Sequence, residues 1–271
     1  MAYLQAPLLT KSGLADHAFS TRLGGRSTGK LSSLNTAFHT GDSVENVLEN
    51  RRLFFGHFDY DYREIVSSVQ VHGTGLALFN QSHRGEGALP GSARQKCDAL
   101  VTTEAGLPLT AYSADCILIY FMSLHKPLVA LAHAGWRGTL GNIGAGIVRY
   151  LDKLFGVTPG RLLVSLSPAI CRNCYLVGSD VAGQFQAAGW DEPAYLEAVE
   201  GNKWKLDLMA INFDQLKQAG VNQENLFKSS WCTSCNPNLF YSYRRDRGET
   251  GRMIGFIALK NYRRPDLEAE V

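Results

Sequence analysis

The stretch "PLVALAHAGWRG", residues 127–138, decides the fold. A short apolar run, typical of a buried strand, reaches His133 and then passes through alanine and glycine into a loop. From Asn142 to Phe155 apolar residues recur at three- and four-residue spacing, which predicts an amphipathic helix that Gly156 can end. This order of strand, loop and helix indicates an α/β protein, in which strand ends commonly carry the chemistry. The small residues around His133 would let another group approach it closely.

The rest of the chain repeats this alternation of short apolar runs and amphipathic segments. Further strands are expected at 64–71, 98–103, 108–113, 116–121, 161–167 and 253–259, where apolar runs are bounded by turn residues. Helices are expected over 41–58 with Asp42 or Ser43 as N-cap, around 181–188, and over 208–219 between Asp207 and Gly220. We therefore predict a mixed α/β (α+β) fold, with mixed β-sheets flanked by helices.

Composition limits the classes of function. The 271 residues are 45% hydrophobic and 19% charged, and the net charge of +2 does not indicate a nucleic-acid binder. No apolar run approaches the length that spans a bilayer, so we expect no membrane insertion. The N-terminal segment lacks the features of a signal peptide, and we expect a cytoplasmic protein, a monomer or a small homo-oligomer. Its six cysteines should then be reduced and available for metal or redox chemistry.

Two other segments resemble the His133 region in their pattern. "SSVQVHGTG" leads a strand into His72, and "LTAYSADCILIY" places Asp115 and Cys116 within an apolar stretch. Two imidazoles and one thiol leave one tetrahedral position open, which is the pattern of a catalytic zinc site. Zinc there would activate water at neutral pH, and Asp115 could orient a ligand or carry a proton. The alternative is that these are structural histidines and a packing thiol, because spacing alone does not bring distant residues together.

Four more cysteines form two pairs, "CRNC" at Cys171 and Cys174 and "CTSC" at Cys232 and Cys235. Such pairs can bind a structural zinc ion, although the 57 residues between them (175–231) exceed the spacing of a compact zinc ribbon. Reduced packing thiols and a redox-active pair remain alternatives. Cys97 has no partner at motif spacing.

A loop rich in arginine and glycine, "YSYRRDRGETGRM", lies near the C-terminus. The flanking segments "NLFYSY" and "MIGFIAL" predict that it joins the strands of a hairpin. Its Arg244 and Arg245, together with Arg137, are candidates for binding phosphate or carboxylate, while a solvated turn is the alternative. The other glycine-rich loop, "STRLGGRSTGKLSSLN", has neither the P-loop nor the dinucleotide-binding spacing.

Taken together, these motifs resemble the laccase-domain or YfiH-like family, whose members are described as multicopper polyphenol oxidases and as purine nucleoside phosphorylases. The resemblance is carried by "STRLGGRSTGKLSSLN", "GDSVENVLENRR", "QVHG", "SADC", "AHAGWRGT", "SPAICRNCYLVG", "CTSC" and "FYSYRRDRGETGRM", which occur in the family's order. It covers nearly the whole chain and implies one domain over 1–271, with 261–271 as a frayed tail, and a fold of the YfiH-like, cysteine-hydrolase type.

The resemblance implies that His72, Cys116 and His133 bind Zn²⁺ and form the active site. It further implies phosphorolysis of adenosine, inosine, guanosine and methylthioadenosine, and deamination of adenosine, so that purine nucleosides and phosphate are the expected partners. The three arginines are our own candidates for the phosphate site, chosen by charge. In "SPAICRNCYLVG" the chain departs from the family's usual "GPAIGPCCYEVG", and a different substrate preference is expected if this loop borders the pocket.

Three other functions compete with this interpretation. One is a non-enzymatic, metal-dependent binding or scaffold protein, in which loss of Cys116 would abolish metal binding without abolishing any turnover. Cys116 as nucleophile with His133 as base would give a cysteine-dependent amidase that edits peptidoglycan precursors. A copper polyphenol oxidase (laccase) ranks lower, because no two of the seven histidines are separated by a single residue, as a multicopper centre typically requires. Metal content distinguishes the zinc enzyme from the amidase.

Overall fold

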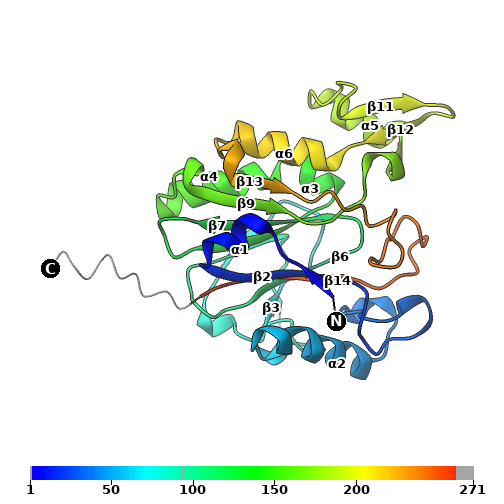
Figure 1. Ribbon diagram of the computed structural model, residues 1–271. Coiled ribbons are helices and arrows are strands. Elements are labelled where there is room, and N and C mark those ends of the chain that lie inside the picture. The colour runs from blue at the N-terminus through cyan, green and yellow to red at the C-terminus, as the bar shows by residue number, and fades with distance from the viewer. Residues whose placement is uncertain (1, 93, 261–271) are drawn as a thin grey trace.

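The protein is arranged in four layers: helices, a six-stranded sheet, a five-stranded sheet and a further helix (Figure 1). The computed structural model describes residues 2–92 and 94–260. The expected tail over 261–271 lies outside the described residues. Among the described helices, none combines the length and the apolar character needed to cross a bilayer.

The six-stranded sheet is mixed and contains the strand of the deciding stretch. Its central pairs are antiparallel, whereas the pair at each edge is parallel. In spatial order its strands are β13 (Leu226–Lys228), β9 (Leu162–Leu166), β7 (Ile117–Ser123), β8 (Val129–Ala134), β5 (Ala99–Thr102) and β4 (Leu76–Phe79).

The five-stranded sheet packs on the other face of this sheet. All its pairs are antiparallel except β6 with β3. Its strands, in spatial order, are β1 (Tyr3–Leu4), β2 (Ala15–Ser20), β14 (Met253–Leu259), β6 (Leu109–Ser113) and β3 (Val66–Ser67).

Helices cover both outer faces of this pair of sheets. In Figure 1, α3 (Trp136–Leu140), α4 (Ile143–Phe155) and α6 (Leu208–Gln218) lie above the six-stranded sheet, and α2 (Val44–Phe55) lies below the five-stranded one. A small antiparallel sheet projects beside α5 (Ser179–Ala187) and consists of β10 (Leu176–Gly178), β12 (Lys203–Leu206) and β11 (Leu196–Val199). The short helix α1 (Pro7–Ser12) precedes β2.

The central strand β7 shows why the apolar runs are continuous rather than alternating. Ile119 and Phe121 pack in the core under α4 and α6, while Leu118, Tyr120 and Met122 pack in the core between the two sheets. Because both faces of the strand are covered, both sets of side chains must be apolar. A third core, with four phenylalanines or tyrosines around Phe256, joins the five-stranded sheet to α2.

The predicted fold class is confirmed, and several local signals have the predicted roles. The side chains of Ser43 and Asp207 cap their helices, and Gly156 ends α4 in the left-handed conformation at φ 63°. The side chain of Asn142 caps α4, which was not predicted. The predicted hairpin around the arginine loop is wrong: β14 is present, but residues 238–252 form irregular turns rather than a partner strand. Within 64–71 only Val66–Ser67 is a strand.

Candidate active site

Three segments converge where β6 and β8 end and β7 begins. His72 lies in the loop after β3, Cys116 immediately precedes β7, and His133 lies near the end of β8. One ligand atom from each of the three lies within 4.8 Å of the other two. The rings of His72 and His133 are 4.8 Å apart at 86°. The structure therefore brings together the three residues that the sequence analysis selected.

Gly135 makes this convergence sterically feasible. A Cβ atom at this position would lie 3.1 Å from Cys116 Sγ and 3.2 Å from His72 Cδ2, closer than side chains normally pack. The backbone of Gly135 has φ −77°, which any residue adopts. The reason for glycine is therefore the close approach of the two side chains, as the small residues of the deciding stretch suggested.

Asp98, a fully buried carboxylate at the start of β5, positions both histidines. One oxygen accepts hydrogen bonds from His72 N and His133 Nδ1, each at 3.0 Å. The other accepts from the N–H groups of Val71, at 3.2 Å, and Gly73, at 2.7 Å. With Nδ1 held by the carboxylate, Nε2 of His133 remains free for a metal or a substrate.

Two residues of the site have left-handed backbone conformations, which residues other than glycine rarely adopt. They are His72 at φ 57° and Asp115 at φ 95°. The Asp115 carboxylate accepts hydrogen bonds from Thr233 Oγ1 at 2.6 Å and from Arg244 N at 2.7 Å. Asp115 therefore fixes the neighbouring loops, and the ligand-orienting role expected for it is occupied by Asp98.

The charges of Cys116 and His133 depend on each other. Burial raises the pKa of Cys116, but the adjacent His133 and His72 outweigh this and lower it to about 6. Burial lowers the pKa of His133, yet Cys116 and Asp98 raise it to about 9. The thiol is therefore readily deprotonated, which is the form in which cysteine binds a metal or attacks an electrophile.

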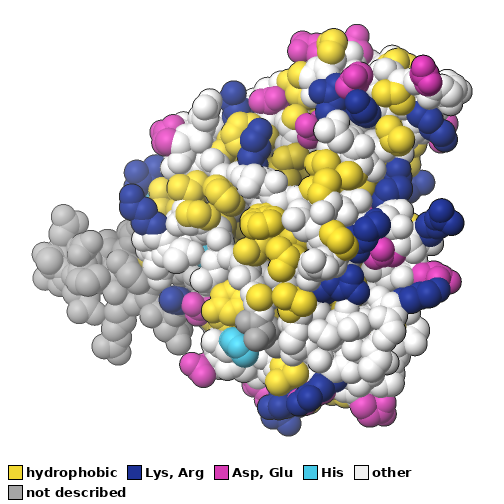
Figure 2. Space-filling view, turned by 45° about the vertical axis from the view of Figure 1, so that its right-hand side comes forward, with side chains coloured by type: hydrophobic (Ala, Val, Ile, Leu, Met, Phe, Trp, Pro, Cys, Tyr) yellow, Lys and Arg dark blue, Asp and Glu magenta, His cyan; other side chains and the backbone are white. Residues whose placement is uncertain are grey.

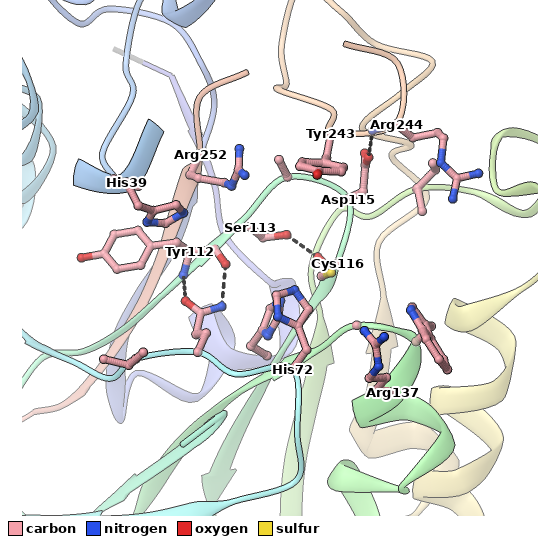
Figure 3. A pocket seen from close by; sticks show the side chains of 18 of the residues that line it. His39, His72, Tyr112, Ser113, Asp115, Cys116, Arg137, Tyr243, Arg244 and Arg252 are labelled. Atoms are coloured by element: carbon pink, nitrogen blue, oxygen red, sulfur yellow. Dashed lines mark hydrogen bonds between the residues drawn. The ribbon is translucent and has the colours of Figure 1, made fainter. Parts of the chain in front are cut away.

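The three residues line a cavity of about 800 Å³. Figure 3 shows His72 and Cys116 at its centre, with Arg252 and His39 on one side and Arg137 and Arg244 on the other. The lining contains five arginines and a single carboxylate: Arg51, Arg94, Arg137, Arg244 and Arg252 against Asp115. On the face drawn in Figure 2, positive and negative side chains are interspersed.

Two of the three candidate arginines are at this cavity and one is not. Arg137 and Arg244 line it. The guanidinium of Arg245 instead donates to the carbonyls of Thr233, Ser234 and Phe240 and pairs with Asp246. Arg245 does not line the cavity, and these partners hold its guanidinium within the loop, so its assignment to the phosphate site stays an untested prediction.

Several residues of the site were not predicted from the sequence. Asp98 stands alone in an apolar segment, and its only available signal was a charged residue at the start of a strand expected to be buried. Arg252, which lies in the arginine loop, and His39 line the cavity but were not selected. Ile170 and Tyr175 also line it, so the loop in which this chain departs from the resembled family does border the pocket.

The two CxxC pairs also come together. One sulfur atom from each of Cys171, Cys174, Cys232 and Cys235 lies within 4.8 Å of the other three. The long separation of the pairs in the sequence is spanned by α5, the small sheet and α6.

The chain is similar to known proteins over most of its length. The family model described as multi-copper polyphenol oxidoreductase laccase matches residues 16–260. A protein of Geobacillus stearothermophilus named purine nucleoside phosphorylase YlmD is 38% identical over 240 residues, 88% of each chain. A purine nucleoside phosphorylase of Deinococcus radiodurans is 37% identical over 254 residues, 93% of each chain.

Solved structures show the same fold. The crystal structure of YlmD from Geobacillus stearothermophilus superposes with a TM-score of 0.90 at 35% identity and covers 96% of this chain and 97% of that one. A Bacillus licheniformis protein, YfiH, gives a TM-score of 0.87 at 33% identity, covering 91% and 93%. The resemblance to the YfiH-like family is therefore confirmed, and the names of the relatives do not favour the amidase alternative.

The copper-oxidase alternative can be compared with the positions of the histidines. All seven lie in the part of the chain that the structure describes, and within that part only His72 and His133 join a potential metal-binding cluster. A multicopper centre needs many more imidazoles, so the described residues do not provide one.

Proposed function

The chain belongs to the multi-copper polyphenol oxidoreductase laccase family, and from this premise we propose that it is a zinc-dependent purine nucleoside phosphorylase that also deaminates adenosine. The observation that carries the proposal is the convergence of His72, Cys116 and His133 in a cavity lined with arginines. The names of the relatives support purine nucleosides and phosphate as its substrates. The cytoplasmic location and the single domain over 1–271 stay predictions.

The residues of the site fit zinc by their chemistry. Two imidazoles and one readily deprotonated thiol form a donor set that zinc accepts, with one position left open. Asp98 fixes the tautomer of His133, as carboxylates commonly do for histidines that bind zinc. Zinc bound here would supply Lewis acidity and activate water at neutral pH.

The cavity also fits the proposed substrates. A volume of about 800 Å³ accommodates a nucleoside together with phosphate. Among the described residues, the guanidinium groups of Arg137, Arg244 and Arg252 form no ion pair with a carboxylate, so their charge is available to an anion. Burial raises the pKa of Tyr175 to about 12, so its phenol remains a hydrogen-bond donor at neutral pH.

We assign the arginines to the phosphate and the central residues to the nucleoside. In phosphorolysis a phosphate oxygen bonds to C1′ of the ribose while the bond from C1′ to the purine nitrogen breaks, and the purine takes up a proton. Arg137, Arg244 and Arg252 would neutralise the phosphate and hold it in the cavity. In deamination water adds at C6 of adenine and ammonia leaves. Adenosine, inosine, guanosine and methylthioadenosine share the purine and ribose that the cavity would recognise.

Product analysis tests the proposal. The protein, purified without chelator, is incubated with adenosine in the presence and absence of phosphate, and with inosine, guanosine and methylthioadenosine in its presence. With phosphate we expect the free base together with ribose 1-phosphate, or with 5-methylthioribose 1-phosphate when methylthioadenosine is the substrate. Without phosphate we expect inosine from adenosine. Both activities should disappear in Cys116→Ala and persist in Cys97→Ala, which alters a buried cysteine outside the site. A wild-type protein that binds zinc but leaves all four nucleosides unchanged would refute the proposed function.

A further inference from the structure

We propose that Cys171, Cys174, Cys232 and Cys235 bind a second zinc ion through four thiolates, and that this ion fixes one wall of the cavity. The site is separate from His72, Cys116 and His133 and shares no ligand with them. All four cysteines are free thiols. Four thiolates arranged around one point favour zinc, or iron held in the same way.

The distances between sulfur atoms fit a tetrahedral ion. With metal–sulfur bonds of about 2.3 Å, the sulfur atoms of a tetrahedral tetrathiolate site lie about 3.8 Å apart. Cys235 Sγ lies 3.9 Å from Cys171 Sγ and 3.4 Å from Cys174 Sγ, and all four sulfur atoms lie within 4.8 Å of one another. These separations fit thiolates that share a metal ion, whereas a disulfide would require about 2.05 Å.

The backbone is arranged to stabilise a thiolate at Cys232. Its Sγ accepts hydrogen bonds from Cys235 N, at 3.4 Å, and from Cys171 N, at 3.2 Å. A single isolated parallel β-bridge between Ala169 and Cys232 joins the two segments that carry the CxxC pairs.

Exposure argues against a packing role for these thiols. Cysteines that serve as small apolar side chains are buried, as Cys97 is in this protein. Of the four clustered cysteines only Cys232 is buried, whereas Cys235 is exposed and Cys171 and Cys174 are half-buried. Burial of apolar surface therefore does not explain why these thiols gather at one point, and metal binding does.

The cluster lies at the base of the cavity wall. Ile170 and Tyr175, which flank the first pair, line the cavity, and the guanidinium of Arg244 lies 4.7 Å from the ring centre of Tyr175. Thr233, inside the second pair, donates to Asp115, which in turn accepts from Arg244 N. Loss of the ion would release both segments and so displace Arg244, while His72 and His133 would remain held by Asp98.

Zinc content and X-ray absorption of the wild-type protein test the proposal without any variant. We expect two zinc ions per chain and an average of about 2.5 sulfur neighbours per zinc, four at one site and one at the other. One zinc ion per chain with a single sulfur neighbour would overturn the proposal, and so would iron in place of the second zinc. Neither readout depends on the substrate, so failure of the proposed nucleoside activity leaves this test intact.

Variants then identify the ligands. Cys174→Ser and Cys235→Ser should each lose one of the two ions, Cys235→His should retain it as a Cys₃His set, and the Cys97→Ala control should retain both. Where the nucleoside activity is present, Cys174→Ser should raise KM for phosphate roughly tenfold, the order expected for one lost charged hydrogen bond, with kcat nearly unchanged. Two zinc ions in Cys174→Ser and Cys235→Ser alike would overturn the proposal.

Discussion

Replacement of Asp98 by asparagine tests how far the hydrogen bonds of its carboxylate position His72 and His133. The substitution keeps the shape of the side chain but leaves one of its two polar atoms unable to accept a hydrogen bond. In the native protein each carboxylate oxygen accepts two: Oδ1 from His72 N and His133 Nδ1, and Oδ2 from Val71 N and Gly73 N. Either orientation of the new amide therefore leaves two groups without their acceptor.

The two orientations have different consequences. If the amide nitrogen replaces Oδ2, two backbone N–H groups lose their acceptor, and we expect a loss of about 1 kcal/mol each, because residues 71–73 are partly exposed. If it replaces Oδ1, the amide donates to His133 Nδ1 and drives the proton to Nε2, which then cannot bind a metal. We therefore expect the free energy of unfolding to fall by about 2 kcal/mol or the affinity for zinc to fall about 10- to 100-fold, and in practice a mixture of both.

Urea unfolding and competition with a chromophoric chelator measure the two quantities separately. Asp152→Asn serves as the matched control, because Asp152 is an exposed carboxylate on α4. We expect the control to match the wild-type protein in both assays. An Asp98→Asn protein with wild-type stability and wild-type affinity for zinc would refute the reasoning, since it would mean that the four hydrogen bonds have no net role.

Three further predictions follow from single features. Gly135→Ala should lower the affinity for zinc about tenfold or more, because the new methyl group displaces Cys116 and His72 while the backbone remains relaxed. Retention of zinc on dialysis equal to that of the wild-type protein would contradict this prediction. Burial lowers the pKa of His17 to about 4, so below pH 6.5 the unfolded chain binds a proton that the folded chain does not, and the free energy of unfolding should fall by up to about 3 kcal/mol between pH 6.5 and 4. The free energy of unfolding, measured across this range, should depend less on pH in His17→Gln. The same pH dependence in the variant as in the wild-type protein would exclude His17 as the cause. Arg245→Met should lower Tm and should raise KM for phosphate less than Arg244→Met does. A larger rise of KM in Arg245→Met than in Arg244→Met would show that Arg245 binds phosphate.

The sequence predicted those parts of the fold whose causes are local. Helix α4 has an apolar stripe, a capping asparagine and a terminating glycine, so its bounds follow from neighbouring residues. The central strands are predictable because both of their faces are buried, which leaves a run of apolar residues long enough to recognise. The small sheet of β10, β11 and β12 lacks such a run, since its strands are short and half-exposed, and it was not predicted.

Features of the site that depend on tertiary contacts were less accessible. Cys116 and His133 are 17 positions apart and are brought together by the antiparallel pairing of β7 with β8; the apolar pattern indicates the two strands but not their pairing. The pairing of β5 with β8 places Asp98 beside His133, and no local sequence pattern predicts that contact. The contacts of Arg245 were inaccessible for the same reason, because sequence identifies a charged group but not the carbonyl groups that surround it.

The strained residues of the site indicate what the surrounding structure contributes to function. Left-handed conformations at His72 and Asp115 cost about 1 to 3 kcal/mol each and persist only where neighbouring contacts determine them. Asp98 holds His72 through backbone N–H groups, and Asp115 is held through its own carboxylate by Thr233 and Arg244. Each strained residue is thus fixed by a carboxylate whose partners come from a distant segment. The site is therefore assembled only when both sheets and the loop at 229–252 are in place, so partial unfolding of that loop should abolish activity before the β-sheet core unfolds.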